Sequence, residues 1–579
     1  MGSPGRWDGG RNGGADRRIW TALQPSFVER EIVRASVAYL HIMRRTTHLG
    51  LVFALVGISA TSAHGQWTQF GGPGRDFHSP AGALASTWPE NGPPVAWRRE
   101  LGDGYAQTLV DGKRLYSMYR RAGLEVIVCM ARDTGSTLWE HEYPVVTHSS
   151  AQQYGDGPSA TPAISGERLV TVGVGIDVHC FDKASGEILW SHDIMEEFEI
   201  PMPGRGYSPS PLIWEGFVIL AVGGTDESNA IDDTANLGLD GGAVVALDIG
   251  TGEIVWANQN YPGSKASPLL IEFDGQEQVV VFMGNEMAGL ELEYGEVLWR
   301  HPHATDFGFN CSTPVFDGVD TLVCSSAYGK PAEAVRLVAG DQGIQVEKLW
   351  SSRRMSLHFT NMLLVNRRLY GVSGMGRPGM LTCLDLDTGE MLWRTRGFSK
   401  ANLISAGSAF VIFDEDGRLA LTTFTDDGPE IHGSLVVTDS HGFTAPTLVG
   451  SELYVRDRTH LTRFDLAPHA RGASFQREQG EQPSNLAELC GVFTCESEGR
   501  EPQELRIRVV DGGLVLEIHD EELVPLAYQL GDALWEFVSD RTSGSVPRTL
   551  EFERGPDGVT AFTLESPFQR ARTYQLTGS

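Results

Sequence analysis

The side chains best suited to chemistry are polar residues that precede short apolar stretches in the middle of the chain. They combine cations, histidines, amides and phenols, a set that suits an anionic ligand or a peptide. The set is Tyr105, Gln107, Arg205, Tyr207, Lys265, Asn310, His358, Asn361, Lys400, Asn402 and His441. If the stretches that follow are the inner strands of one ring, these side chains meet at one mouth of its channel. The alternative is that they only line a wet channel.

Sequence motifs of familiar enzymes are absent. The chain has no G-x-S-x-G, H-E-x-x-H, C-x-x-C or S-x-x-K sequence, so no nucleophile or catalytic zinc site can be assigned. One G-x-G-x-x-G occurs at 374–379, but a dinucleotide site must open a helix after a strand. Pro378 and the apolar run behind it predict a hairpin loop instead. The sequence therefore predicts no catalytic residue.

An acidic loop at Gly223–Gly242 is the candidate for a metal site. Its carboxylates could gather Ca²⁺, and they are Asp226, Glu227, Asp232, Asp233 and Asp240. Because EF-hand spacing is missing, we favour a solvated loop and predict no bound metal.

The charge of the chain excludes one class of partner. Against 75 acidic residues stand 46 Lys and Arg, which gives a formal net charge of −29. Contacts to phosphates need clustered Lys and Arg. We therefore expect neither nucleic acid nor an anionic membrane surface as a partner.

A repeat predicts the elements that position these side chains. Six segments join a Gly-centred turn to a final Trp, and neighbouring tryptophans lie 43–66 residues apart. These tryptophans are Trp139, Trp190, Trp256, Trp299, Trp350 and Trp393. In the turn, Asp accepts backbone hydrogen bonds and Gly adopts positive φ. A hairpin signal precedes most turns, so each unit predicts four short strands, the pattern of a propeller blade.

Two more blades lack this Trp. Residues 400–437 and 441–465 each carry three strand signals, and the second stops before its fourth strand. The missing strand occurs earlier, as PPVAWRREL with Trp97. Joining it to the last blade removes a free sheet edge. We therefore predict an all-β fold with an eight-bladed β-propeller over 66–467, anchored by Trp97 and the six repeat tryptophans.

These units resemble the tryptophan-docking repeats of the pyrroloquinoline quinone (PQQ)-like β-propellers, and QWTQFGGPGR at 66–75 resembles the opening of exported bacterial members. That superfamily includes quinoprotein alcohol dehydrogenases and the BamB-type scaffold of outer-membrane protein assembly. For an active dehydrogenase, the resemblance implies axial PQQ with Ca²⁺, an Asp base, a stacked Trp and commonly a vicinal Cys pair. The chain has no adjacent cysteines. We therefore expect no cofactor, and PQQ with Ca²⁺ is the alternative.

The C-terminal part departs from the repeat. Residues 468–484 are polar and predict a linker. Alternating apolar stretches with Gly turns predict a small antiparallel β-barrel or sandwich over 485–579. This region resembles the lipocalin-like module appended to β-lactamase-like hydrolases, whose opening is similar to residues 486–493.

The N-terminal region predicts export. Two arginines precede the apolar run LGLVFALVGISA at 49–60, and the small-residue sequence Ala-His-Gly follows it. Parts in this order form a signal peptide, so we predict one over 43–65 and a periplasmic or secreted protein. Residues 1–42 are then not native or form a disordered leader. The run is too short for a transmembrane helix, and a buried strand or helix is the alternative.

The cysteines predict buried thiols, and one pair could form a disulfide. The three at one shared repeat position should be small buried side chains: Cys129, Cys180 and Cys383. A two-residue turn at Asp317-Gly318 would place Cys311 opposite Cys324, which allows a cross-strand disulfide. Two buried thiols are the alternative there.

Intact structural motifs and missing catalytic motifs favour one function. We expect an exported, non-catalytic binding scaffold that presents its channel mouth to a ligand or a protein partner, and we expect a monomer. A PQQ-dependent alcohol or sugar dehydrogenase is the enzymatic alternative, and an envelope assembly factor of the BamB type is the third.

Overall fold

The computed structural model describes residues 65–79, 84–89, 91–147, 155–200, 202–203, 205–223, 242–306, 308–374, 379–438 and 440–468, and eight strands between 491 and 578. Residues 43–64 of the predicted signal peptide, the five carboxylates of the acidic loop and the predicted linker from 469 onward lie outside these residues. Among the described residues, no helix is long and apolar enough to cross a membrane. One short helix, α2 (Ile194–Glu197), follows the second blade.

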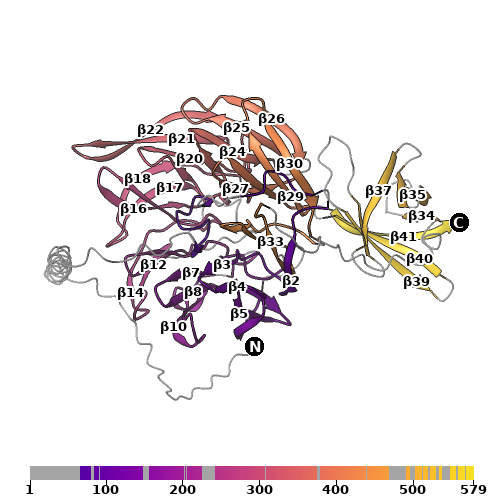
Figure 1. The fold of residues 1–579 in the computed structure, drawn as a ribbon, viewed down its shortest axis with the longest axis horizontal. Coiled ribbons are helices and arrows are strands. Elements are labelled where there is room, and N and C mark those ends of the chain that lie inside the picture. Colours follow the sequence, from indigo (N-terminus) through magenta and orange to yellow (C-terminus); the bar gives the residue numbers. More distant parts are fainter. Residues whose placement is uncertain are drawn as a thin grey trace, which may run out of the picture. The chain divides into compact units, whose positions relative to one another are not determined.

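Eight sheets, each built on four antiparallel strands, follow one another around a ring and form the blades of a propeller (Figure 1). Blade 1 comprises β3 (Leu109–Asp111), β4 (Arg114–Arg121), β5 (Leu124–Ala131) and β6 (Thr137–Pro144), and blade 2 comprises β7 (Ala163–Ser165), β8 (Arg168–Val172), β9 (Asp177–Asp182) and β10 (Ile188–Asp193). Blade 3 comprises β11 (Leu212–Trp214), β12 (Phe217–Ala221), β13 (Val244–Asp248) and β14 (Ile254–Asn258), and blade 4 comprises β15 (Leu269–Phe273), β16 (Gln276–Phe282), β17 (Glu286–Glu291) and β18 (Val297–Pro302). Blade 5 comprises β19 (Val315–Phe316), β20 (Thr321–Cys324), β21 (Ala332–Gly340) and β22 (Gly343–Ser352), and blade 6 comprises β23 (Leu363–Val365), β24 (Arg368–Ser373), β25 (Gly379–Asp385) and β26 (Met391–Phe398). Blade 7 comprises β27 (Ala401–Ala406), β28 (Ala409–Asp414), β29 (Arg418–Phe424) and β30 (Pro429–Val436), and blade 8 comprises β31 (Thr447–Val449), β32 (Glu452–Arg456), β33 (His460–Asp465) and β2 (Val95–Glu100). The predicted eight-bladed, all-β ring is confirmed.

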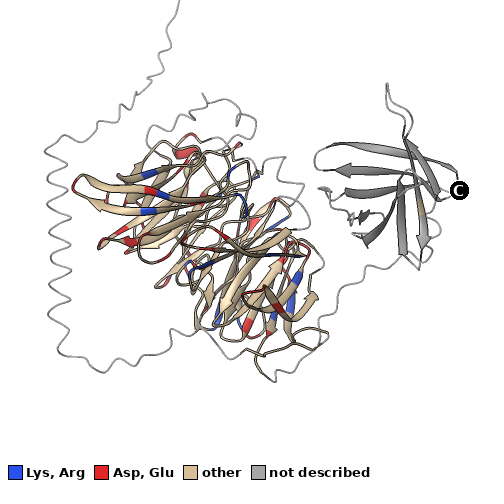
Figure 2. Cartoon of the chain, turned by 90° about the horizontal axis from the view of Figure 1, so that it is seen from above, with Lys and Arg blue, Asp and Glu red and all other residues tan. Residues whose placement is uncertain are grey.

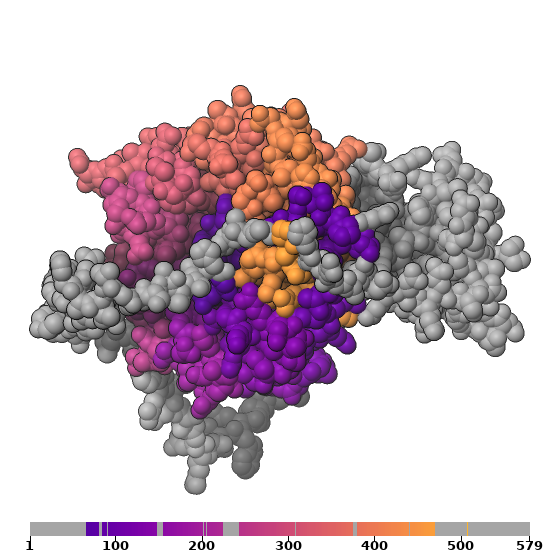
Figure 3. All heavy atoms as spheres, in the orientation of Figure 1, coloured from indigo at the N-terminus to yellow at the C-terminus, as the bar shows by residue number. Residues whose placement is uncertain are grey.

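The last blade contains both ends of the ring. Strand β2 pairs antiparallel with β33, from Val95 opposite Phe464 to Glu100 opposite His460. Figure 3 shows the result, with orange atoms of the last blade beside indigo atoms of the first part of the chain. The predicted closure by an early strand is confirmed, and blade 8 gains a complete set of four strands.

The chain before β2 crosses the axis of the ring. We call residues 66–79 the channel segment. Trp67, which is fully buried, forms a bridge with Val110 of β3. The Ile164 N–H of β7 donates to the Thr68 carbonyl at 2.8 Å. The segment therefore begins along the inner strands of blades 1 and 2.

The channel segment ends on the other side of the ring. Its strand β1 (His78–Ser79) runs parallel to β27 of blade 7, and the Ser79 hydroxyl donates to the Leu448 carbonyl of blade 8 at 2.9 Å. Between these points, the buried Arg75 guanidinium donates to the Pro211 carbonyl of blade 3 at 3.0 Å. Contacts to five blades thus hold the segment in the channel.

Six of the seven predicted Trp anchors dock on the next blade. Their indole Nε1 donates to a backbone carbonyl of that blade at 2.7–3.2 Å: Trp97 to Arg132, Trp139 to Lys183, Trp190 to Ile249, Trp256 to Leu292, Trp350 to Leu386 and Trp393 to Thr425. In the first five cases the indole lies against the turn glycine so closely that a Cβ there would clash with the ring. Trp299 differs, because its Nε1 donates at 2.5 Å to Gln278 of its own blade.

The C-terminal strands form a closed antiparallel barrel, in which β41 returns to β34. They are β34 (Gly491–Cys495), β35 (Gln503–Val510), β36 (Gly513–Ile518), β37 (Glu522–Gln529), β38 (Leu534–Phe537), β39 (Arg548–Gly555), β40 (Gly558–Ser566) and β41 (Gln569–Gly578). The predicted small antiparallel β-domain is confirmed, and its form is a barrel.

The disulfide that the sequence allows between Cys311 and Cys324 is not formed, because both cysteines are free. Strands β19 and β20 pair through Phe316 and Leu322, so the turn is longer than two residues and the cysteines are not opposite each other. The Asp317 carboxylate produces the longer turn, since it accepts the three N–H groups of residues 319–321. The other three described cysteines are buried as predicted.

Candidate functional site

A belt of hydrogen bonds joins the starts of the inner strands around half of the ring. In it, the backbone N–H of one blade donates to a hydroxyl of the next blade. Gln107 donates to Thr161, Thr161 to Ser210, Ser210 to Ser267 and Ser267 to Thr313, at 2.9–3.2 Å. Each hydroxyl residue precedes a proline that opens the inner strand. This Ser/Thr-Pro signal is legible in the sequence, although we did not predict the belt.

The predicted amide side chains continue this linkage. The Asn361 N–H donates to Asn402 Oδ1 at 3.0 Å, and the Asn361 amide binds both backbone groups of Leu403 at 2.7 and 2.8 Å. Gln107 donates to the Pro446 carbonyl at 2.7 Å and accepts from the channel segment at 3.1 Å. These groups hold neighbouring blades together and face no open site.

Two further predicted residues are also engaged inside the ring. Asn310 is fully buried, donates to the Met283 carbonyl at 2.6 Å and accepts from the Ser326 hydroxyl at 2.5 Å. The buried Tyr207 hydroxyl donates to the Ala221 carbonyl at 3.0 Å. Their polarity is satisfied by the fold, as buried polar groups require.

The structure brings three residues of the predicted set together with four other aromatic residues in a row of half-buried rings. Consecutive ring centroids lie 4.7–5.9 Å apart. We call it the mouth row, and its members are Phe309, Tyr328, His358, Phe359, Phe443, Tyr105 and His441. Most lie in the loops before the inner strands of blades 5, 6, 8 and 1. The predicted Tyr105, His358 and His441 thus share one surface.

Lys400 contributes the charge at the centre of this row. It precedes β27 of blade 7, and its Nζ lies 4.8 Å from the centre of the Phe359 ring, a distance suited to a cation–π contact. The same Nζ forms an ion pair with the buried Glu415 carboxylate at 2.9 Å. The ammonium is therefore fixed over an aromatic face.

The two other predicted cations come from blades 3 and 4. Lys265 Nζ donates to the Gly206 carbonyl at 2.5 Å, and Arg205 is exposed. Burial lowers the pKa of His358 to about 3, and the nearby charges of Lys400 and Arg205 lower it in the same direction. The imidazole is therefore neutral, with its Nε2 hydrogen-bonded to the Tyr328 hydroxyl.

Sequence reasoning missed four members of the mouth row: Phe309, Tyr328, Phe359 and Phe443. The sequence pattern favours polar side chains as candidate ligands, whereas the half-buried surface is mostly aromatic. A signal was present, because Phe359 adjoins His358 and Phe443 lies two residues after His441.

Comparison with known proteins agrees with this geometry. A family model described as outer membrane protein assembly factor BamB matches residues 123–395, which run from blade 1 to blade 6. The ring is a PQQ-like β-propeller. No curated protein sequence matches the chain.

Solved structures similar to this PQQ-like propeller include proteins with different names. BamB from Moraxella catarrhalis is 17% identical, with a TM-score of 0.45 over 64% of this chain and 99% of that chain. Quinohemoprotein alcohol dehydrogenase from Comamonas testosteroni is 14% identical, with a TM-score of 0.49 over 73% of this chain and 83% of that chain. A europium-containing methanol dehydrogenase is 12% identical, with a TM-score of 0.46 over 68% and 89%.

The donors at the mouth of the PQQ-like propeller do not fit PQQ with Ca²⁺. Ca²⁺ takes several oxygen ligands from carboxylates and amides. Here Glu415 is paired with Lys400, and the side-chain amides of Asn361 and Asn402 are bound to backbone groups of other residues. The mouth row, as far as the structure describes it, contains no Trp to stack on a quinone.

Proposed function

We propose that the protein is a non-catalytic binding scaffold that presents the mouth row and Lys400 to a protein partner. The observation that carries this proposal is a half-buried aromatic row shared by four blades, beside a fixed ammonium group. Aromatic side chains dominate the energy of protein interfaces because they bury large areas at low entropy cost. We also propose export to the periplasm or beyond, which rests on the signal predicted over 43–65.

The charge distribution supports a protein partner. Figure 2 shows acidic and basic residues mixed along the blades of a chain whose net charge is −29. Against that background, Lys400, Lys265 and Arg205 gather near the channel mouth. A partner with an acidic and aromatic segment would match this surface.

The test compares partner capture by two mouth variants and one control. Phe359→Ala and Phe443→Ala should each weaken a captured partner at least about tenfold, because truncation of an interface hot spot costs about 2 kcal/mol or more. Ile431→Ala removes an exposed side chain of β30 and should change nothing. The measurement is quantitative pull-down from envelope extracts followed by titration of the purified partner. Equal capture by all three variants contradicts the proposal.

The enzymatic alternative has its own measurement. Purified protein is titrated with PQQ and Ca²⁺ and assayed with dye-linked alcohols and aldoses. We expect neither saturable PQQ binding nor turnover. Turnover that depends on added PQQ would replace the scaffold proposal with a dehydrogenase.

A further inference from the structure

The junction of blades 4 and 5 lacks the connection that most other junctions share. Trp299 of blade 4 binds Gln278 of its own blade, whereas six other tryptophans donate to the next blade. The reason lies in blade 5, where β21 and β22 are joined by a tight turn at Gly340 and Gly343 in place of the Asp-x-x-Thr-Gly turn. The belt hydrogen bond from Ser267 to Thr313 links the inner strands of these two blades, but the Trp contact farther out is missing.

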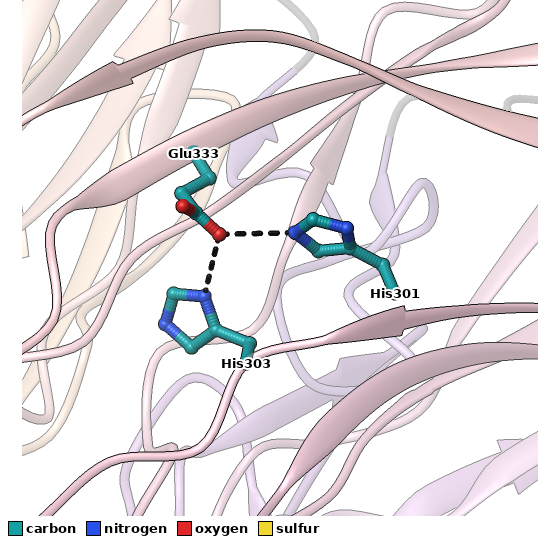
Figure 4. Close-up of side chains that lie close together, drawn as sticks. All are labelled: His301, His303 and Glu333. Carbon is teal, nitrogen blue, oxygen red and sulfur yellow. Dashed lines mark hydrogen bonds and ion pairs between the residues drawn. The ribbon is translucent and has the colours of Figure 1, made fainter.

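Two histidines and a carboxylate meet at this junction (Figure 4). His301 lies on β18 and His303 follows it; positions i and i+2 of an extended chain share one face, so both point towards blade 5. The Glu333 carboxylate of β21 lies between them, with Oε2 at 3.0 Å from His301 Nε2 and 3.2 Å from His303 Nδ1. All three residues are buried: the His303 side chain is fully enclosed, and the side chains of His301 and Glu333 are each 11% exposed.

These separations are those of ligands around one metal ion. Zinc binds imidazole nitrogen and carboxylate oxygen at about 2.0–2.2 Å, so two such ligands on a tetrahedral ion lie roughly 3.3 Å apart. The three ligand atoms lie within 4.8 Å of one another. We propose that His301, His303 and Glu333 bind Zn²⁺, which links blades 4 and 5 where the tryptophan dock is missing.

Strand β22, in the same blade as Glu333, contributes a cation beside this carboxylate. Lys348 Nζ binds the other carboxylate oxygen, Oε1, at 2.9 Å and leaves Oε2 to the ion.

Three further features describe the surroundings of these ligands. His303 makes its side-chain hydrogen bonds only at Nδ1, since its buried Nε2 has no partner. The Cys324 Sγ lies 3.6 Å from the same Nδ1, which places a thiol beside the ligand set. Lys348 is half exposed, so the ion can reach the carboxylate when this side chain moves aside.

The test measures retained metal in the full chain. After dialysis against buffer with low micromolar Zn²⁺, each wild-type chain should retain one more Zn²⁺ ion than each chain of Glu333→Gln or His301→Gln. Affinity in these variants should fall more than about 100-fold, since loss of a supporting outer partner alone costs 10–100-fold. His192→Gln is the matched control, because His192 pairs with a single carboxylate, Glu197, at 2.8 Å and should keep the full amount.

Two further readouts keep the proposal falsifiable if a ligand variant folds poorly. Lys348→Met keeps all three ligands and removes a competing cation, so it should bind Zn²⁺ more tightly; unchanged or weaker binding would overturn the site. Co²⁺ should give the visible spectrum of a four-coordinate ion in wild type but not in Glu333→Gln. Equal Zn²⁺ retention by wild type and Glu333→Gln would show an internal hydrogen-bond network without a metal.

Discussion

Glu125 shows how one buried acid makes the stability of the ring depend on pH. It lies on β5, accepts from the Tyr143 hydroxyl at 2.6 Å and accepts from the Val174 N–H of the next blade at 3.0 Å. Burial raises its pKa from 4.5 to about 7, although both hydrogen bonds oppose this shift. Burial between blades 1 and 2 therefore favours the protonated form of this carboxyl group.

The sign of the effect follows from proton binding in the two states. Below about pH 4.5 both states hold the proton, and Glu125 has no effect. Between 4.5 and 7 the unfolded chain releases it first, so the free energy of unfolding falls as pH rises, by about 3 kcal/mol once pH exceeds 7. Glu125→Gln should therefore stabilise the protein at pH 8 more than at pH 5.

Thermal unfolding at the two pH values measures this difference. Glu142→Gln, at a half-exposed position on the adjacent strand β6, is the control and should shift the unfolding temperature equally at both. A Glu125→Gln shift that is the same at pH 5 and pH 8 contradicts the prediction.

The docking of tryptophans on turn glycines can be tested at the scale of one blade. Gly252 has φ of +79°, and a Cβ there would lie 2.8 Å from the Trp190 ring. Gly275 has a similar φ of +74° with open space around it. The left-handed backbone lowers the free energy of unfolding of both Ala variants by about 1 kcal/mol. Gly252→Ala must also displace an indole, which lowers it by about 1–3 kcal/mol more. Differential scanning calorimetry should therefore show the larger loss for Gly252→Ala, and equal losses would remove the docking argument.

The same elements show what the sequence can predict. Blade number and ring closure followed from local signals, since Gly turns, Trp strands and the stray Trp97 strand recur with a legible period. The Cys311–Cys324 register did not, because the Asp317 carboxylate reorganises a turn that looks like a two-residue hairpin. The His301, His303 and Glu333 cluster was also missed, since its members meet only when β18 packs beside blade 5.

At the scale of the whole ring, closure depends on residues that come first in the chain. A chain that starts at Leu101 lacks the channel segment and β2. It should lose more than about 5 kcal/mol, because one buried Trp alone contributes about 3–5 kcal/mol and this part carries Trp67 and Trp97. A chain that starts at His64 is the control and should unfold like the full-length protein. Calorimetry compares them, and equal unfolding temperatures would contradict the closing role of β2.

The antiparallel pairing of β2 with β33 also has a mechanical consequence. Val95 of β2 and Phe464 of β33 lie at the same end of the paired strands. Tension applied at that end would therefore break the hydrogen bonds between the strands one after another. On the N-terminal side, however, the channel segment is tied to five blades before the chain reaches β2. Force applied to the beginning of the chain therefore acts first on the channel segment. The pairing of β2 with β33 bears no force until that segment has been pulled out of the channel.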